Sequence, residues 1–236
     1  MPVSLAEEAY VAIRDEILRG ALRPGSALSR RRLAVQLGMS VLPVSDALRR
    51  LEEDGLVESR PRAGTRVRVP SESDVRELYE LREALETQAA RLFTERATSA
   101  QRRELKRLAD EVDLLFSRLP THKDDPAFRY RVHNTHVAFH TWIAEHARSA
   151  LLKQMIERKH VLILNWLFDV TGRRTALPFG FHAALADALV SGDADRADAA
   201  MRAHVRYGLA EIAGRIGALA ASEWRERRKA VDGLRA

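Results

Sequence analysis

Apolar residues in the first twenty positions recur at the spacing of one face of a helix. They are Leu5, Ala9, Ile13 and Ile17. Their four-residue spacing predicts an amphipathic helix over residues 5–19. Pro24 and Gly25 follow it and indicate a turn.

Two shorter helices with a glycine between them are predicted next. Ser29 can cap a helix that runs to Leu37, and Gly38 ends that helix. Ser40 can cap the following helix, which ends near Gly55. The apolar face of this second helix consists of Val44, Ala47, Leu48 and Leu51.

A basic hairpin follows these helices. Residues 56–59 and 65–69 are predicted strands, because the second alternates strictly and the connection contains Pro61 and Gly64. Two short helices joined through a glycine turn and followed by a hairpin are typical of a winged helix-turn-helix, which binds DNA.

The rest of the chain has the periodicity of helices throughout. Capping boxes are predicted at Ser71 with Asp74 and at Thr98 with Gln101. The expected helices cover residues 73–97, 99–118, 127–146, 149–171, 179–191 and 194–221. The fold class is therefore mainly α, a winged helix-turn-helix followed by an all-α helical bundle. We expect a DNA-binding domain at 1–70, a linker at 71–73, a helical domain at 74–222 and a charged tail at 223–236.

Composition narrows the class of protein. The 236 residues contain no cysteine, which excludes disulfides and thiolate metal sites and suits a reducing cytoplasm. No segment approaches the roughly 18 consecutive apolar residues of a membrane span, so we expect no membrane association. The net charge is +6, and the window 30–68 holds nine arginines against five acids. That balance is compatible with nucleic acid, although arginines can also merely solvate a surface.

Motifs in both halves resemble one family of bacterial regulators. The first half is similar to the winged-helix signature of the GntR family, and the second to the FCD effector domain of its FadR-like branch. The N-terminal matches are Leu22–Gly25, Leu33-Ala34, Leu37-Gly38, Pro43-Val44, Ala47-Leu48, Leu51-Glu52, Gly55–Val57 and Gly64-Thr65. The C-terminal matches are Leu78–Arg82, Leu85-Glu86, Phe139-His140, His182, Gly192-Asp193, Met201 and His204. The resemblance implies a homodimer, a palindromic double-stranded operator and a small effector that changes DNA binding; we expect a repressor.

The resemblance also indicates which residues contact DNA. The expected set is Arg31, Ser40, Val41, Leu42, Ser45, Arg49, Arg62, Gly64 and Thr65. The family's recognition helix begins Ser-Arg-Thr-Pro-Val-Arg, whereas here Val41 and Ser45 replace the two arginines and Leu42 replaces the threonine. Guanine readout should be weakened, while Val41 or Leu42 could contact a thymine methyl group. The alternative is a degenerate head that serves mainly as a protein-interaction module.

All eight histidines lie in the second half, and His136 and His140 are four apart on one predicted helix face. The resemblance implies a metal site formed by His136, His140, His182 and His204, with His136 in place of the family's aspartate. Four imidazoles suit a divalent transition metal, zinc or nickel. Because they leave the metal charge uncompensated, we expect a carboxylate-bearing effector. The alternative is a degenerate site in which His136 hydrogen-bonds within a polar cavity.

Two further alternatives concern single residues. Arg82 could pair with an effector carboxylate, or it could form an i,i+4 ion pair with Glu86 on the helix surface. His136 and His140 also suggest a zinc hydrolase, but Val137 occupies the place of the glutamate that acts as general base in such enzymes. We therefore expect a regulator and not an enzyme.

Overall fold

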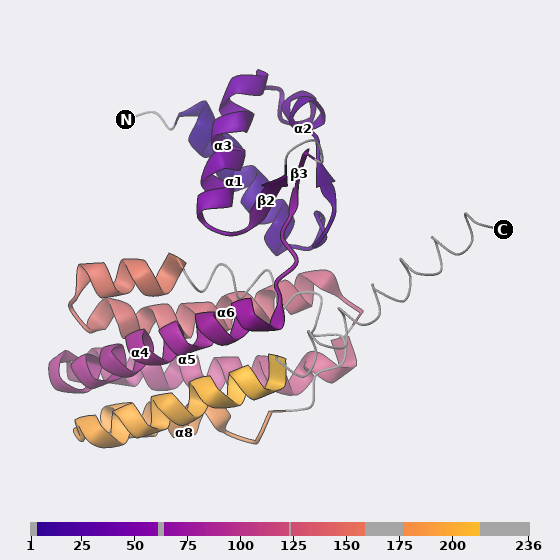
Figure 1. Ribbon diagram of the computed structural model, residues 1–236. Coiled ribbons are helices and arrows are strands. Elements are labelled where there is room, and N and C mark those ends of the chain that lie inside the picture. Colours follow the sequence, from indigo (N-terminus) through magenta and orange to yellow (C-terminus); the bar gives the residue numbers. More distant parts are fainter. Residues whose placement is uncertain (1–3, 61–63, 123, 159–176, 213–236) are drawn as a thin grey trace. The chain divides into compact units, whose positions relative to one another are not determined.

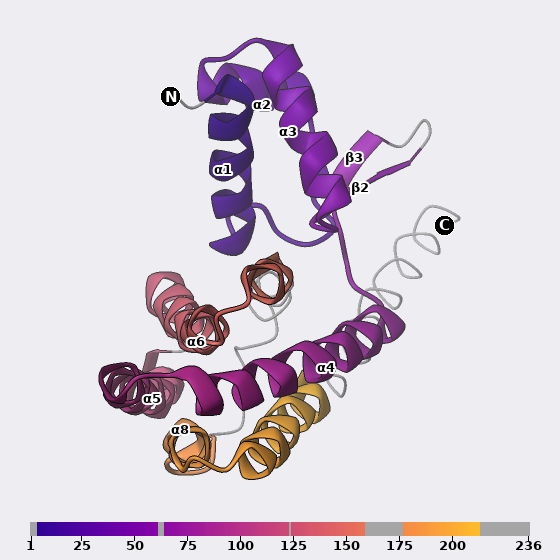
Figure 2. The ribbon, with the colours of Figure 1, turned by 90° about the vertical axis from the view of Figure 1, so that its left-hand side faces the viewer.

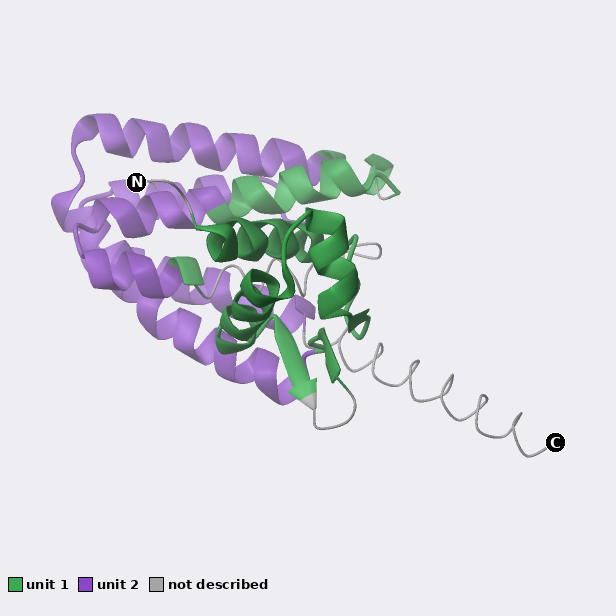
Figure 3. Cartoon of the chain, turned by 90° about the horizontal axis from the view of Figure 1, so that it is seen from above, with its two compact units in different colours: residues 1–69, 118–137, 157–172 green, residues 70–117, 138–156, 173–236 purple. Residues whose placement is uncertain are grey.

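A computed structural model describes residues 4–60, 64–122, 124–158 and 177–212. Some predicted features lie outside these residues. They are Arg62, the tail at 223–236 and parts of the helices predicted at 149–171 and 194–221. The chain divides into two compact units, one of residues 1–69, 118–137 and 157–172 and one of residues 70–117, 138–156 and 173–236 (Figure 3). We call the second of these the helical unit. The predicted class, mainly α with an N-terminal winged helix-turn-helix, is confirmed.

The head, formed by residues 4–69, has three helices and a small antiparallel sheet (Figures 1 and 2). The helices are α1 (Leu5–Leu18), α2 (Arg30–Leu37) and α3 (Val41–Glu53). The strands are β1 (Ala27–Leu28), β2 (Val57–Arg60) and β3 (Gly64–Val67), in the order β1-β3-β2. The two-residue strand β1 was not predicted, since two residues are too few to show an alternating pattern.

The apolar stripes predicted from the sequence form the core of the head, except for Leu5, which is 56% exposed in the first turn of α1. Helix α3 packs against both α1 and α2. The buried side chains of the three helices are Ala9, Ile13, Ile17, Leu18, Leu33, Ala34, Val44, Ala47, Leu48 and Leu51. Their burial holds α2 and α3 as a rigid pair, which is what a recognition helix needs in order to be presented at a fixed angle.

The glycine between α2 and α3 adopts a left-handed backbone conformation. Gly38 has φ of 65° and ψ of 29°, and its N–H bonds the carbonyl oxygens of Ala34 and Val35. A Cβ there would meet no atom within 4 Å, so only the backbone conformation disfavours a side chain.

Gly38→Ala is therefore expected to destabilise the head by about 1 kcal/mol, because an L-residue at positive φ is strained by roughly that amount. Urea denaturation followed by circular dichroism would measure it. Gly38→Asn is the matched control, because asparagine adopts the left-handed conformation more readily than alanine and should cost less. Equal stability of Gly38→Ala and the wild type would contradict the argument.

The helical unit is built from long helices. They are α4 (Glu72–Arg96), α5 (Ser99–Arg118), part of α6 (Pro126–His146), the helical residues 150–156, α8 (Phe181–Val190) and the helix over 194–212. A short 3-10 helix, η1 (Leu119–His122), lies where only a break was predicted. Both predicted capping boxes are confirmed, at Ser71 with Asp74 and at Thr98 with Gln101.

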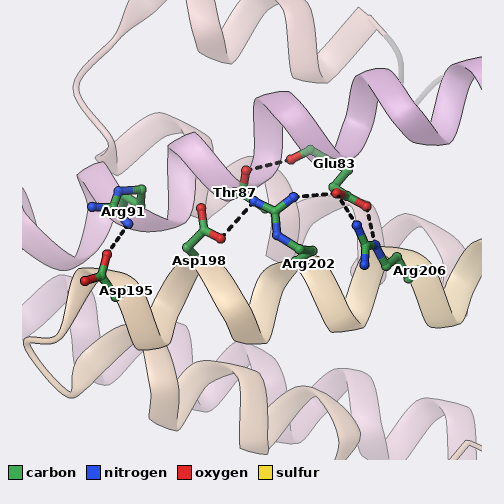
Figure 4. Close-up of polar contacts among 7 residues, drawn as sticks. All are labelled: Glu83, Thr87, Arg91, Asp195, Asp198, Arg202 and Arg206. Carbon is green, nitrogen blue, oxygen red and sulfur yellow. Dashed lines mark hydrogen bonds and ion pairs between the residues drawn. The ribbon is translucent and has the colours of Figure 1, made fainter.

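Ion pairs tie α4 to the helix over 194–212 (Figure 4). Glu83 pairs with Arg202 and, at 2.7 Å, with Arg206, while Arg91 bonds Asp195 at 2.6 Å. Arg202 also bonds Asp198 at 2.9 Å. These contacts fix the register of the two helices, although their exposure limits their contribution to stability.

Among the described residues, no helix combines the length and the apolar character that a membrane crossing requires.

Candidate functional site

Three helices of the helical unit bring buried histidines together. His140 lies on α6, His182 on α8 and His204 on the helix over 194–212, and each is at most 7% exposed. His136 lies one turn before His140 on the continuous helix α6 and is half-buried. Ligand nitrogens of His136, His182 and His204 all lie within 4.8 Å of one another. The four histidines expected to bind metal are thus neighbours in the structure.

The fourth histidine joins this group through His204. The Nε2 atoms of His140 and His204 are 3.2 Å apart. Two nitrogens that bind one ion at about 2.0–2.1 Å each are separated by roughly 3.0–3.4 Å. The pair therefore fits two ligands of a single ion, and the buried imidazoles are the donor type that zinc, nickel and related metals accept.

A carboxylate from α5 orients His182. Oδ1 of Asp113 accepts a hydrogen bond from His182 Nδ1 at 2.6 Å, and the same carboxylate accepts the backbone N–H groups of His182 and Ala183. Although burial alone raises the pKa of Asp113, the hydrogen bonds from His182 and Ala183 lower it below its usual value. Asp113 is therefore ionised, and it caps the N-terminus of α8 while it holds the imidazole.

A second buried carboxylate orients His140. Glu86 Oε2 lies 2.6 Å from His140 Nδ1, and Glu86 Oε1 accepts a bond from Arg82 Nε at 2.6 Å. The Arg82 guanidinium also stacks over the ring of Tyr79, 4.7 Å from its centroid. Burial alone lowers the pKa of Arg82, but Glu86 and then Tyr79 outweigh it and raise the pKa. Arg82 thus forms the i,i+4 pair with Glu86, and this pair is buried, not on the helix surface.

His204 is in the protonation state that a metal ligand requires. Burial, followed by the charges of His140 and His182, lowers the pKa of His204 well below its ordinary value. His204 is therefore a neutral imidazole at pH 7, with a lone pair for a metal ion.

Aromatic rings enclose the imidazoles. Phe116 stacks on His182 at a centroid distance of 5.5 Å, and Phe181 stacks on His204 at 4.7 Å. Phe139 is fully buried and meets His140 and His182 edge-on, at 5.3 and 5.6 Å. These rings limit both solvent access and rotation of the imidazoles.

In the head, residues expected to contact DNA line one cleft. The cleft has a volume of about 540 Å³ and is lined by Leu28, Ser29, Arg30, Arg31, Ser59, Gly64 and Thr65. Arg30, Arg31 and Arg32 are exposed, and no ion pair joins them to an acid within the described part of the chain. The structure therefore brings Arg31 and the wing residues Gly64 and Thr65 to one concave, basic surface. The Thr65 side chain is itself buried beside Ser59, 3.1 Å between hydroxyl oxygens.

The first two residues of α3 are exposed and uncharged. Val41 is 43% exposed and Leu42 is 72% exposed. Ser40 occupies the N-cap position but makes no side-chain cap bond, so the predicted capping role of its hydroxyl is not observed. The Ser45 hydroxyl donates to the Val41 carbonyl at 2.9 Å, which leaves its oxygen as an acceptor. Farther along the helix, Arg49 is engaged by Glu53 at 2.5 Å.

Asp113 was missed by sequence reasoning, and Glu86 was considered only as a surface partner of Arg82. Asp113 is 69 residues from His182, so no local spacing could join them. One signal was present: Asp113 lies among Val112, Leu115 and Phe116 on the apolar face of its helix, where an acid needs a partner.

Two family descriptions match the sequence. "Bacterial regulatory proteins, gntR family" matches residues 5–67, and "FCD domain" matches residues 77–207. The first match covers the head and the second covers most of the helical unit and all four histidines.

Curated relatives and a solved structure agree with these matches. An HTH-type transcriptional regulator in the TAR-I ttuE-ttuC' intergenic region of Agrobacterium vitis is 44% identical over 82 residues, 35% of this chain and 48% of that protein. The HTH-type transcriptional repressor RspR of Escherichia coli is 32% identical over 95 residues, 40% of this chain and 42% of that protein. The chain thus spans about half the length of these relatives or less. A GntR transcriptional regulator from Rhodococcus sp. RHA1 has the same fold, with a TM-score of 0.74, 24% identity, and coverage of 90% of this chain and 99% of that one.

Proposed function

Because this chain belongs to the GntR-family regulators that carry an FCD domain, we propose that it is a ligand-responsive transcription regulator that binds double-stranded DNA as a homodimer. The observation that carries the proposal is the cleft in which Arg31 meets Gly64 and Thr65, in a head whose arginines at 30–32 are exposed. Arginines placed in this way bind phosphates and position α3 in the major groove. The relatives are regulators, and the name of one includes repression, which supports a repressor acting in the bacterial cytoplasm.

The helical unit would bind the controlling ligand. The clustered imidazoles favour a divalent transition metal, zinc or nickel, with His136, His140, His182 and His204 as its ligands. A metal ion bound by imidazoles polarises an anionic ligand in an open coordination position, and a small organic acid fits that description. Arg82 is held by Glu86, so its pairing with the effector carboxylate requires that it exchange partners.

One continuous stretch of chain, helix α4, connects residues beside this site to the end of the head. Helix α4 begins at Glu72, within the linker expected at 71–73, and carries both Arg82 and Glu86. An effector that binds one arrangement of α4 more tightly than another would shift the population of DNA-competent dimers, as thermodynamic linkage requires.

Selection of random duplex DNA on the full-length protein, at near-physiological salt and with zinc supplied, tests the function. We expect a palindromic consensus whose half-sites are about 10 base pairs apart, or a multiple of that, centre to centre. Enrichment of no sequence, together with weak salt-dependent binding, would contradict it and favour a head that serves as a protein-interaction module. The exposed apolar residues Val41 and Leu42 are the feature that would fit that second function.

The bases at the tip of α3 can be predicted from its chemistry. Leu42 and Val41 present methyl groups where the family has polar and basic residues, and thymine is the base that offers a methyl group in the major groove. Replacing the contacted thymine by uracil in the selected operator should weaken binding about fourfold per site, from the ~0.8 kcal/mol that burying one methyl-sized group provides.

The control for this exchange is uracil at a position outside the half-sites. Leu42→Ala should abolish the sensitivity to uracil. Equal affinity for the thymine and uracil operators would contradict methyl readout without affecting the evidence for sequence-specific binding.

A further inference from the structure

We propose that Glu86 and Asp113 are positioning residues of the metal site, which aim the Nε2 atoms of His140 and His182 at the ion and supply negative charge that an all-imidazole ligand set lacks. The inference rests on the metal site proposed above. It concerns residues outside the ligand set. It arises from two carboxylate–imidazole contacts of equal length, a hydrogen bond between Asp113 and His182 and an ion-pair contact between Glu86 and His140.

In each of the two contacts, a carboxylate oxygen lies 2.6 Å from the Nδ1 atom of a buried histidine. Glu86 holds His140 with both side chains almost completely buried, and Asp113 holds His182, which is 1% exposed. An ionised carboxylate can only accept, so the proton must be on Nδ1 of each ring. Each Nε2 atom is then an unprotonated donor to a metal, and for His140 it is the atom that faces His204.

The two carboxylates also change the charge balance. A carboxylate bonded to the far nitrogen of a ligating imidazole raises its basicity and offsets part of the metal charge. Arg82 compensates one of the two carboxylates, because it bonds the other oxygen of Glu86. Asp113 therefore leaves one net negative charge beside the site. A divalent ion would keep one net positive charge, which matches one carboxylate of an effector.

Asp113 has a structural role as well, so its substitution must separate two functions. Its oxygens accept the backbone N–H groups of His182 and Ala183 at the start of α8. Asp113→Asn keeps an acceptor oxygen for these N–H groups but removes the charge that pairs with the imidazole. Glu86→Gln makes the same exchange beside His140.

Zinc affinity of the full-length protein, measured by competition with a chromogenic chelator, tests the inference. We expect Glu86→Gln and Asp113→Asn each to bind zinc about 10–100-fold more weakly than the wild type, as is typical for such partners. Two matched controls lie on the same helices. Glu83→Gln removes a carboxylate that pairs with Arg202 and Arg206 (Figure 4), and Asp110→Asn removes an exposed acid one turn before Asp113. Glu83 bonds arginines and Asp110 is exposed, so both variants should retain wild-type affinity.

A second measurement needs no substitution. Long-range ¹H–¹⁵N correlation spectra of the metal-free protein at neutral pH distinguish the two imidazole tautomers. We expect His140 and His182 to be protonated at Nδ1.

The outcomes separate this inference from the proposed metal site. Wild-type affinity in both Glu86→Gln and Asp113→Asn, or Nε2-protonated rings in the spectra, would overturn the positioning role alone. A wild-type protein that binds neither zinc nor nickel would overturn the metal site and the inference with it.

Discussion

His204→Ala is expected to lower zinc affinity by at least about 100-fold. That is more than the roughly 10–100-fold loss typical when a residue that only hydrogen-bonds a metal ligand is replaced. His204 belongs to the group of three histidines whose ligand nitrogens lie within 4.8 Å, and its Nε2 is 3.2 Å from that of His140. Its removal therefore deletes the donor that joins His140 to the other two. Isothermal titration with zinc and with nickel would measure the change.

The matched control is His122→Ala. His122 is exposed in η1 and hydrogen-bonds the Arg118 carbonyl, outside the cluster. The His122→Ala protein should bind zinc and nickel with the affinity of the wild type. The His204 variant should still select the wild-type operator, since the head is unaltered, but should no longer respond to effector. Undiminished zinc binding by His204→Ala would place the metal elsewhere in the protein.

Phe139→Ala should cost about 3–5 kcal/mol of unfolding free energy, the range for deletion of a buried phenylalanine side chain. Phe139 has no exposed surface and touches the rings of His140 and His182. The substitution leaves a cavity beside two of the proposed metal ligands, so it should also weaken zinc binding. Urea denaturation of the metal-free and zinc-loaded protein would give both quantities.

A graded series strengthens this test. Phe139→Leu fills most of the space and should cost less than Phe139→Ala. Leu114→Ala removes an apolar side chain that is 51% exposed on α5, and it should change stability by about 0.5 kcal/mol or less. A Phe139→Ala protein as stable as the Leu114→Ala protein would contradict the assigned packing.

Periodicity predicted the helices well because burial in this fold follows local spacing. The stripe of Ala9, Ile13 and Ile17 is buried as expected, and α4 begins at the predicted capping box. Strand β1 could not be found in this way, because its two residues are defined by pairing with Arg66 and Thr65 of β3. Elements that exist only through a distant partner leave no periodic signal.

Of the candidate site, the sequence predicted only which histidines come together. His136 and His140 are one helical turn apart, which is a local feature, whereas His182 and His204 were assigned through the family resemblance. The sequence left Arg82 between two roles, and the structure assigns it to a buried pair with Glu86. The partnership of Asp113 with His182 spans 69 residues and depends on how α5 and α8 pack.

Asp113 both caps α8 and bonds His182, and these two roles restrict which substitutions position 113 can accept during evolution. One carboxylate both starts a helix and orients a histidine, so a lineage that abandoned the metal would still be selected to keep the acid at position 113 for the sake of α8. An engineer who transplants the histidines into another helical scaffold faces the converse, because α8 and its capping acid have to be moved together.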